Sequence, residues 1–188
     1  MKKLIVLIAA ALSFNTMALT LDMNLTMNDQ TTLKAQNEKT FIRTQSVVSG
    51  KFSITVTEDG DTQTVGQDIP PQGVFEPTFS LELIDSGRLR IVDKDENIDQ
   101  IVAAKISKTM FGTLKTVSIS KETLKAVYAE SLQREGLMLL SSFGLETDEL
   151  TLSTGFDFTD MDCAYDKDAK NLLCEQSALL SIKASDNQ

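Results

Sequence analysis

Apolar and polar residues alternate strictly along Leu19 to Asn28, where every odd position is apolar and every even position is polar. This period of two is typical of a β-strand that buries one face and exposes the other. The same pattern predicts strands over Thr40 to Val48 and from Phe52 to Val56. Asp59-Gly60 follows the latter segment and predicts a hairpin turn, because Asp-Gly favours the tight turns that join antiparallel strands.

A second hairpin is predicted beyond a loop. The segment Gln67 to Pro77 contains all three prolines of the chain and therefore predicts irregular structure. After it, apolar residues alternate with polar ones at Phe79, Leu81 and Leu83. Asp85-Ser86-Gly87 is a suitable turn, and the alternation continues at Leu89 and Ile91. We expect two antiparallel strands joined by this turn.

Helical spacing follows between Asn97 and Gly112. Apolar residues recur there at the three- and four-residue steps of a helix face, and Asn97 and Gly112 are suitable residues to begin and end a helix. The residues on this face are Ile98, Ile101, Val102, Ile106 and Met110, with Lys105 and Thr109 completing the steps. The pattern therefore predicts a first amphipathic helix.

A second helix is predicted after Ser120, which is a suitable N-cap. Thr116 to Ser120 itself is expected to be extended. The helix would bury Leu124, Val127, Tyr128 and Leu132. We expect Gly136 to end or bend this helix, whereas Leu137 to Leu140 fits either a continuing helix or a short strand.

The end of the chain returns to alternation. Leu150, Leu152, Phe156 and Phe158 share one face of a predicted strand, and so do Leu172, Cys174, Ala178, Leu180 and Ile182 in the next. The parity slips between Phe158 and Met161, which predicts a β-bulge near Thr159 or Asp160. Together the elements predict an α+β fold: a curved antiparallel sheet of about seven strands, two amphipathic helices on one face and one disulfide-stapled hairpin.

The first 18 residues have the three parts of a secretory signal peptide. Two lysines precede the apolar run Leu4 to Leu12, and the small-residue sequence ending at Ala18 is a suitable cleavage site. The run of about 9 residues is too short to span a bilayer. We therefore expect residues 1–18 to be a signal peptide, residues 19–188 to be one domain without a transmembrane segment, and the protein to be periplasmic or secreted.

The only two cysteines, Cys163 and Cys174, flank a polar turn between alternating segments. Pairing them across a hairpin places Tyr165 opposite Leu172 and keeps the register of both strands. Because an even cysteine count in an exported protein favours a disulfide, we expect these two residues to be bonded to each other.

The charge of the chain excludes one class of partner. The net charge is −9, and removing Lys2 and Lys3 with the signal peptide leaves 16 basic and 27 acidic residues, a net charge near −11. We expect no nucleic-acid partner, because nucleic acids are bound through phosphate contacts of lysine and arginine. The same charge argues against docking on anionic lipids through a basic face.

Few catalytic arrangements remain open. The chain has no histidine, which excludes Ser-His and Cys-His nucleophiles and the usual zinc and iron sites, and we expect neither a metal nor a cofactor. Asp93 to Asn97 begins like a calcium-binding loop, but Ile98 stands where glycine is needed and Ala104 where the bidentate glutamate should be. A carboxylate pair could act on glycosides, although 27 acidic residues do not single out a pair.

We therefore expect an exported, non-enzymatic protein that binds a lipid, another apolar ligand or an envelope protein. The expected architecture is similar to that of the periplasmic lipoprotein carriers, a likeness of architecture that involves no shared motif. The residues expected to line an apolar site are Phe79, Leu81, Leu83, Leu152, Phe156 and Phe158. Two other functions stay open: an assembly module that pairs with its partner through Leu19 to Asn28, and a carboxylate-dependent hydrolase.

Overall fold

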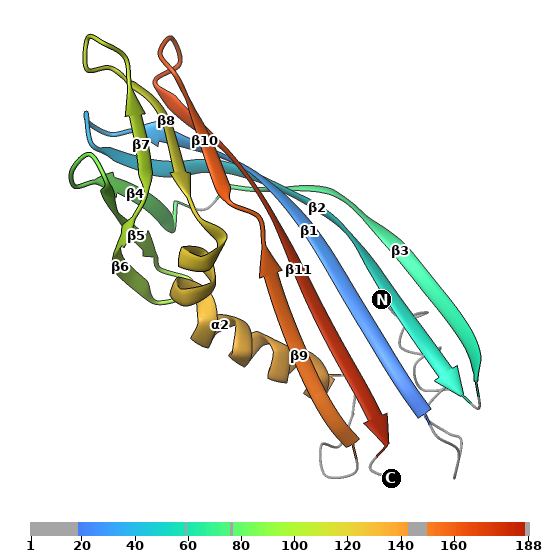
Figure 1. Ribbon diagram of the computed structural model, residues 1–188. Helices are drawn as coiled ribbons and strands as arrows, with labels where there is room; N and C mark the ends of the chain where they lie inside the picture. The colour runs from blue at the N-terminus through green and yellow to red at the C-terminus, as the bar shows by residue number, and fades with distance from the viewer. Residues whose placement is uncertain (1–18, 59, 76, 143–149, 187–188) are drawn as a thin grey trace.

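The computed structural model describes residues 19–58, 60–75, 77–142 and 150–186 (Figure 1). Within this part of the chain, eleven strands form one antiparallel sheet, and one helix lies against it. The strands are β1 (Leu19–Ala35), β2 (Thr40–Glu58), β3 (Asp61–Val74), β4 (Phe79–Leu83), β5 (Arg88–Asp93), β6 (Ile98–Ala103), β7 (Lys105–Lys108), β8 (Leu114–Ile119), β9 (Leu150–Phe158), β10 (Met161–Asp166) and β11 (Asn171–Asp186). The helix is α2 (Lys121–Ser142).

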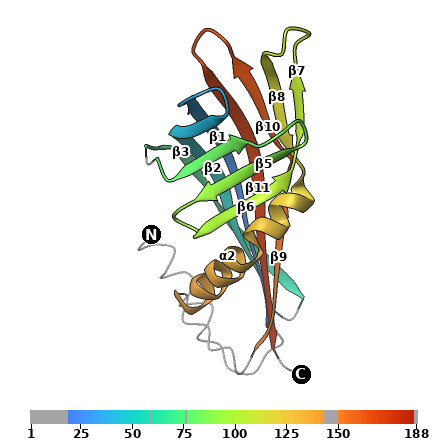
Figure 2. The same cartoon turned by 90° about the vertical axis from the view of Figure 1, so that its left-hand side faces the viewer.

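Three long strands, β2, β1 and β11, run the whole length of the molecule and belong to two different regions (Figure 1). In one region the strand order is β6-β5-β4-β2-β1-β11-β10-β8-β7, and the sheet curls into a nearly closed barrel (Figure 2). In the other region β3 extends the sheet beyond β2, and β9 extends it beyond β11. We call these regions the barrel end and the sheet end.

Each region has its own apolar core. The barrel-end core surrounds Leu33, Leu81, Leu89, Ile119 and Leu172, whose side chains are fully buried. The sheet-end core is smaller and consists of Leu21, Met23, Ile54, Ile182 and Ala184, with Phe52, Val56 and Leu180 packed against it. The strand predicted over Leu19 to Asn28 is confirmed as part of β1, whose Leu21 and Met23 belong to the sheet-end core.

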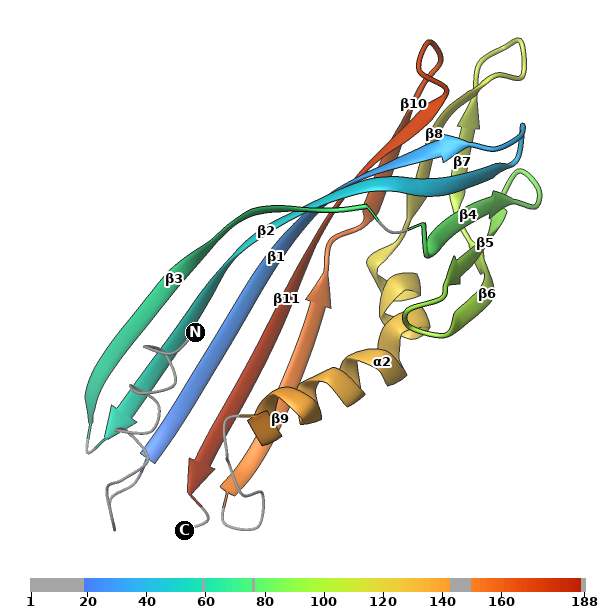
Figure 3. The ribbon, with the colours of Figure 1, turned by 180° about the vertical axis from the view of Figure 1, so that it is seen from behind.

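The α+β prediction is wrong. The described residues are mostly antiparallel strand, and α2 is the one helix among them. It lies beside β9 and reaches β6, as the view from behind shows (Figure 3). Helix α2 begins where predicted, with the Thr123 amide donating to Ser120 Oγ at 3.3 Å. It continues through Gly136 to Ser142, so Leu137 to Leu140 belongs to the helix.

The helix predicted between Asn97 and Gly112 is replaced by strands β6 and β7. Ile98 and Val102 also fit a period of two, and their β-branched side chains favour extended backbone. Strand β5 offers β6 a hydrogen-bonding edge, with Ile98 paired to Asp93 and Val102 to Leu89. Ile101, which a helix would have buried, is 59% exposed on the outer face.

The loop predicted over Gln67 to Pro77 is also wrong over most of its length. Residues up to Val74 belong to β3, which pairs only with β2. Proline has no amide hydrogen to donate. It is therefore tolerated on such an edge strand or at a bulge, where no partner strand needs that hydrogen bond. Pro70 and Pro71 lie at the register shift, between the pairs formed by Ile69 with Gly50 and by Gln72 with Val48.

Strand β2 joins the two segments that the sequence predicted as separate strands, and it does so through Gly50. A Cβ at this position would lie 2.2 Å from the Thr26 carbonyl oxygen of β1. Glycine is therefore needed where the two strands approach most closely, beside the register shift between Val48 and Gly50. This register shift lies within the part of β2 that pairs with β3, at the sheet end.

The C-terminal predictions are confirmed. Cys163 and Cys174 are direct partners across β10 and β11, with their Cα atoms 4.0 Å apart, and they form a disulfide. Tyr165 lies opposite Leu172, as expected. Residues 159–161 stand opposite only residues 176 and 177 of β11, so one extra residue forms a bulge where it was predicted.

Candidate ligand-binding clefts

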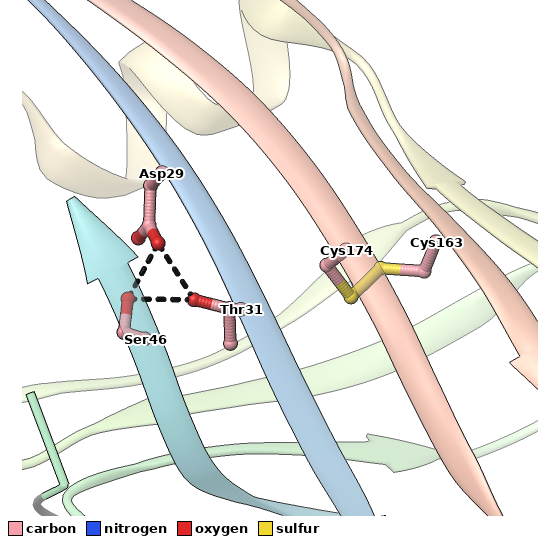
Figure 4. Close-up of a disulfide and its surroundings, with 5 residues drawn as sticks. All are labelled: Asp29, Thr31, Ser46, Cys163 and Cys174. Carbon is pink, nitrogen blue, oxygen red and sulfur yellow. Dashed lines mark hydrogen bonds between the residues drawn. A yellow bond between two sulfur atoms is a disulfide. The ribbon is translucent and has the colours of Figure 1, made fainter. Parts of the chain in front are cut away.

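The apolar inner face of β1 is interrupted by polar residues halfway along the strand. After Met27 the inward positions are occupied by Asp29 and Thr31, and Thr31 stands directly opposite Ser46 of β2. The three side chains meet in a triangle of polar contacts (Figure 4). Asp29 Oδ1 accepts from Thr31 Oγ1 at 2.9 Å and from Ser46 Oγ at 2.5 Å, and the two hydroxyls are 2.9 Å apart. Because Thr31 and Ser46 are buried, this triangle is a polar site within the sheet.

A cleft of about 300 Å³ opens at this polar interruption, which we call the central cleft. Its lining comes from strands β1, β2, β4, β5, β9, β10 and β11, from helix α2 and from the turn between β5 and β6. The apolar lining residues are Met27, Val48, Phe79, Phe158, Met161 and Ala178. The polar ones are Asp29, Thr31, Arg43, Asp93, Glu96, Tyr128, Ser131 and Gln176.

Asp93 and Tyr128 form a hydrogen-bonded pair in the wall of the central cleft. Tyr128 donates its hydroxyl to Asp93 Oδ2 at 3.2 Å. Burial raises the pKa of the Asp93 carboxyl, although hydrogen bonds and the charge of Arg43 act in the opposite direction. Burial and the neighbouring carboxylate raise the pKa of Tyr128 as well, so its phenol remains a proton donor.

Two further groups of hydrogen bonds and ion pairs connect the elements that form the wall of the cleft. Ser131 and Arg134 of α2 both donate to Glu96 Oε2, the latter at 3.0 Å, which ties the helix to the turn between β5 and β6. Arg43 of β2 donates to Thr78 and lies 3.5 Å from Asp95 Oδ2. The carboxylates of the lining thus outnumber its one guanidinium.

A second cleft, of about 540 Å³, lies among the loops at the open end of the barrel. We call it the mouth cleft. Its lining comes from the turns between β1 and β2, between β4 and β5, and between β7 and β8. Phe41 and Tyr165 meet edge to face in its wall, with ring centroids 6.1 Å apart. Phe111, from the turn between β7 and β8, also lines it.

The structure separates five of the six residues predicted to line one apolar site. Phe79 and Phe158 line the central cleft, and Leu83 lines the mouth cleft. Leu81 is fully buried in the barrel-end core. Phe156 is half-buried on β9 opposite Leu180, while the side chain of Leu152 lies outside the described residues.

Sequence reasoning missed the polar half of the central cleft. The sequence did contain a sign of this polar half. Asp29 and Thr31 occupy the same side of the predicted strand as Met27, but they are polar where the pattern calls for apolar residues. The sequence of Asp93 to Asn97 resembled only the start of a calcium-binding loop. In the structure it is a tight turn in which the Asp95 amide donates to Asp93 Oδ1 at 3.2 Å.

Two features are absent from the described residues. These residues contain no group of three or more acidic or cysteine side chains arranged to hold a metal ion. Helix α2, the one helix among them, is not long and apolar enough to cross a membrane. The predicted signal peptide, residues 1–18, lies outside the described residues.

Comparison of the chain with models of protein families, with curated proteins and with solved structures gave no match.

Proposed function

We propose that this protein is an exported, non-enzymatic protein that binds a small amphiphile in the central cleft. The observation that carries the proposal is the composition of the cleft wall. Apolar side chains such as Met27, Phe79 and Phe158 stand opposite a wall of acceptors and donors that includes Asp93 and Tyr128. A ligand with an apolar tail and a hydrogen-bonding head would match both halves.

The size and charge of the cleft narrow the class of ligand. A volume of about 300 Å³ is at the lower end of the range for small-molecule sites, which favours a small or short-chained molecule. Asp29, Asp93 and Glu96 outnumber Arg43 among the charged lining residues. A head group that carries amines or hydroxyls would be bound better than a carboxylate or a phosphate.

Native mass spectrometry of the protein purified from its own host tests the proposal. We expect a discrete adduct that organic solvent releases. Ala178→Phe places a ring in the central cleft and should abolish the adduct. Leu179→Phe is the matched control, because adjacent strand residues face opposite sides and Leu179 is exposed on the other face. A bare mass, or an adduct that Ala178→Phe leaves intact, would overturn the proposal.

A carboxylate-dependent hydrolase is the second candidate, and Asp93 is the observation in its favour. A carboxyl whose pKa is raised by burial is suited to donate a proton. Screening glycosides and esters with the purified protein tests this function. Turnover that falls in both Asp93→Asn and Asp29→Asn would support it, whereas turnover unaffected by both changes would exclude these carboxylates.

The alternative of strand addition through Leu19 to Asn28 receives no support from the geometry. Strand β1 pairs with β2 along one edge and with β11 along the other, over nearly its whole length. A partner strand would therefore have to displace one of these neighbours.

A further inference from the structure

The hairpin of β7 and β8 differs in charge from the rest of this acidic chain. Between Asp99 and Glu122 the sequence contains no acidic residue. Lys105, Lys108 and Lys115 lie on the two strands of the hairpin, and all three are exposed. The overall charge of −9 therefore hides one basic element at the open end of the barrel.

The tip of this hairpin presents two large apolar side chains to solvent. Met110 is 91% exposed and Phe111 is 88% exposed, more than any other large apolar residue of the described chain. The turn is held by its own hydrogen bonds: the Thr109 amide donates to the Thr113 carbonyl at 2.8 Å, and the Gly112 amide donates to the Thr109 carbonyl at 2.9 Å. Gly112 has φ +81°, a conformation that a glycine adopts without strain.

The neighbouring loops do not offset this basic charge. The β10–β11 turn projects beside the hairpin tip (Figures 1 and 3) and carries two acids and two lysines, namely Asp166, Lys167, Asp168 and Lys170. In the turn between β4 and β5, Asp85 is paired with Arg88 at 2.7 Å. An anionic surface that approaches this end of the barrel would thus meet the three hairpin lysines without a compensating cluster of acids.

We propose that the β7–β8 hairpin docks the protein on an anionic lipid bilayer. Met110 and Phe111 would enter the interfacial region of the bilayer, while Lys105, Lys108 and Lys115 would contact the head groups. The two signals act together, because a pair of apolar side chains alone or a few lysines alone gives weak membrane binding. The expectation drawn from net charge, that no basic face would meet anionic lipids, does not apply to this hairpin.

This docking surface goes beyond the proposed ligand and does not depend on it. The central cleft lies on the inner face of the sheet and contains no residue of the hairpin. Loss of the ligand adduct in the experiment above and loss of vesicle binding in the experiment below are therefore separate outcomes. The mouth cleft does contain Phe111, so docking would bring that cleft to the lipid surface.

Tryptophan fluorescence offers a direct test, because the chain has no tryptophan of its own. In the Phe111→Trp protein we expect a blue shift on vesicles that contain phosphatidylglycerol, and quenching by brominated acyl chains. Phe75→Trp is the matched control, since Phe75 is 70% exposed and belongs to the β3–β4 connection rather than to the hairpin. Its emission should not change when the same vesicles are added.

Vesicle co-sedimentation measures the contribution of the apolar tip residues and that of the lysines separately. Met110→Ser/Phe111→Ser should lower the partition coefficient about tenfold or more, and Phe75→Ser should leave it unchanged. Each lysine replaced by glutamine should lower it about fivefold on anionic vesicles. Absence of binding by the unaltered protein, equal binding to neutral vesicles, or binding that survives the tip changes would overturn the proposal. So would retention by an envelope protein rather than by protein-free vesicles.

Discussion

The barrel end and the sheet end are built on the same three strands, β1, β2 and β11, but they differ in how their cores are enclosed. At the barrel end the curled sheet surrounds its core, and Leu33, Leu81 and Leu172 have no exposed surface. At the sheet end only five strands lie side by side, and Phe52 and Val56 at the edge of its core are partly exposed. Strand pairing is thus continuous along the molecule, whereas core enclosure differs between its two ends.

The central cleft lies at the boundary between these regions. There the inward positions of β1 change from Met27 to Asp29 and Thr31, and the apolar contacts of the sheet end stop before those of the barrel end begin at Leu33. Two cores that do not merge leave space between them. The central cleft is therefore a consequence of the polar residues Asp29 and Thr31, and not of a defect in either core.

Truncating one core residue at each end should give the largest effect and the clearest contrast. Leu81→Ala should lower the free energy of unfolding by about 4 kcal/mol, because the enclosed barrel cannot collapse around the cavity. Ile54→Ala should cost about 2 kcal/mol, since its partly exposed neighbours have fewer contacts to lose. Urea unfolding followed by circular dichroism measures both values. Equal losses would contradict the difference between the two cores.

Removing the disulfide should come next in size and concerns the barrel end. Cys163→Ala/Cys174→Ala should lower the free energy of unfolding by about 3 kcal/mol, the value that the chain-entropy model gives for a loop of this order. A reducing agent should lower the stability of the unaltered protein by a similar amount. The variant is its control, because its stability should not respond to reduction.

A methyl group at Gly50 should strain the pairing of β2 with β1 at the sheet end. Gly50→Ala should cost about 2 kcal/mol, because the new Cβ meets the Thr26 carbonyl and the strands must move apart. Gly66→Ala on β3 is the matched control, since its nearest neighbour would be 3.4 Å away. If both variants unfold at the same urea concentration, the close approach at Gly50 does not limit stability.

The smallest expected effect is a contrast in pH dependence between Asp93 and Asp157. The pKa of Asp93 is raised in the folded protein. Its contribution to the free energy of unfolding is therefore complete below 3.8, the pKa in the unfolded chain, and is lost as pH rises through the pKa in the folded protein. The pKa of Asp157 on β9 is lowered by its hydrogen bond with Lys125, so its contribution is present above 3.8 and is lost as pH falls.

Unfolding free energies measured from about pH 3 to about pH 7 reveal the sign of each contribution. Relative to the unaltered protein, Asp93→Asn should gain stability as pH rises. Asp157→Asn should lose stability over the same range. The same sign in both variants would show that the cleft does not hold Asp93 in the protonated form that its burial favours.

The sequence by itself determined those features that depend on neighbouring residues. Strict alternation identified β1, the spacing around Cys163 and Cys174 identified the stapled hairpin, the parity slip identified the bulge near Asp160, and Ser120 identified the start of α2. Each of these follows from local geometry: side chains alternate along a strand, and a cap accepts hydrogen bonds from its own first turn.

The tertiary structure alone decided what depends on distant partners. Ile98 to Lys108 fits helical and extended periods alike, and the free edge of β5 decided for strands. The prolines of β3 are tolerated because that strand lies at an edge, which only the order of the sheet reveals. The central cleft likewise joins Asp29, Asp93 and Tyr128 from three distant segments, and the pairing of strands and helix brought them together.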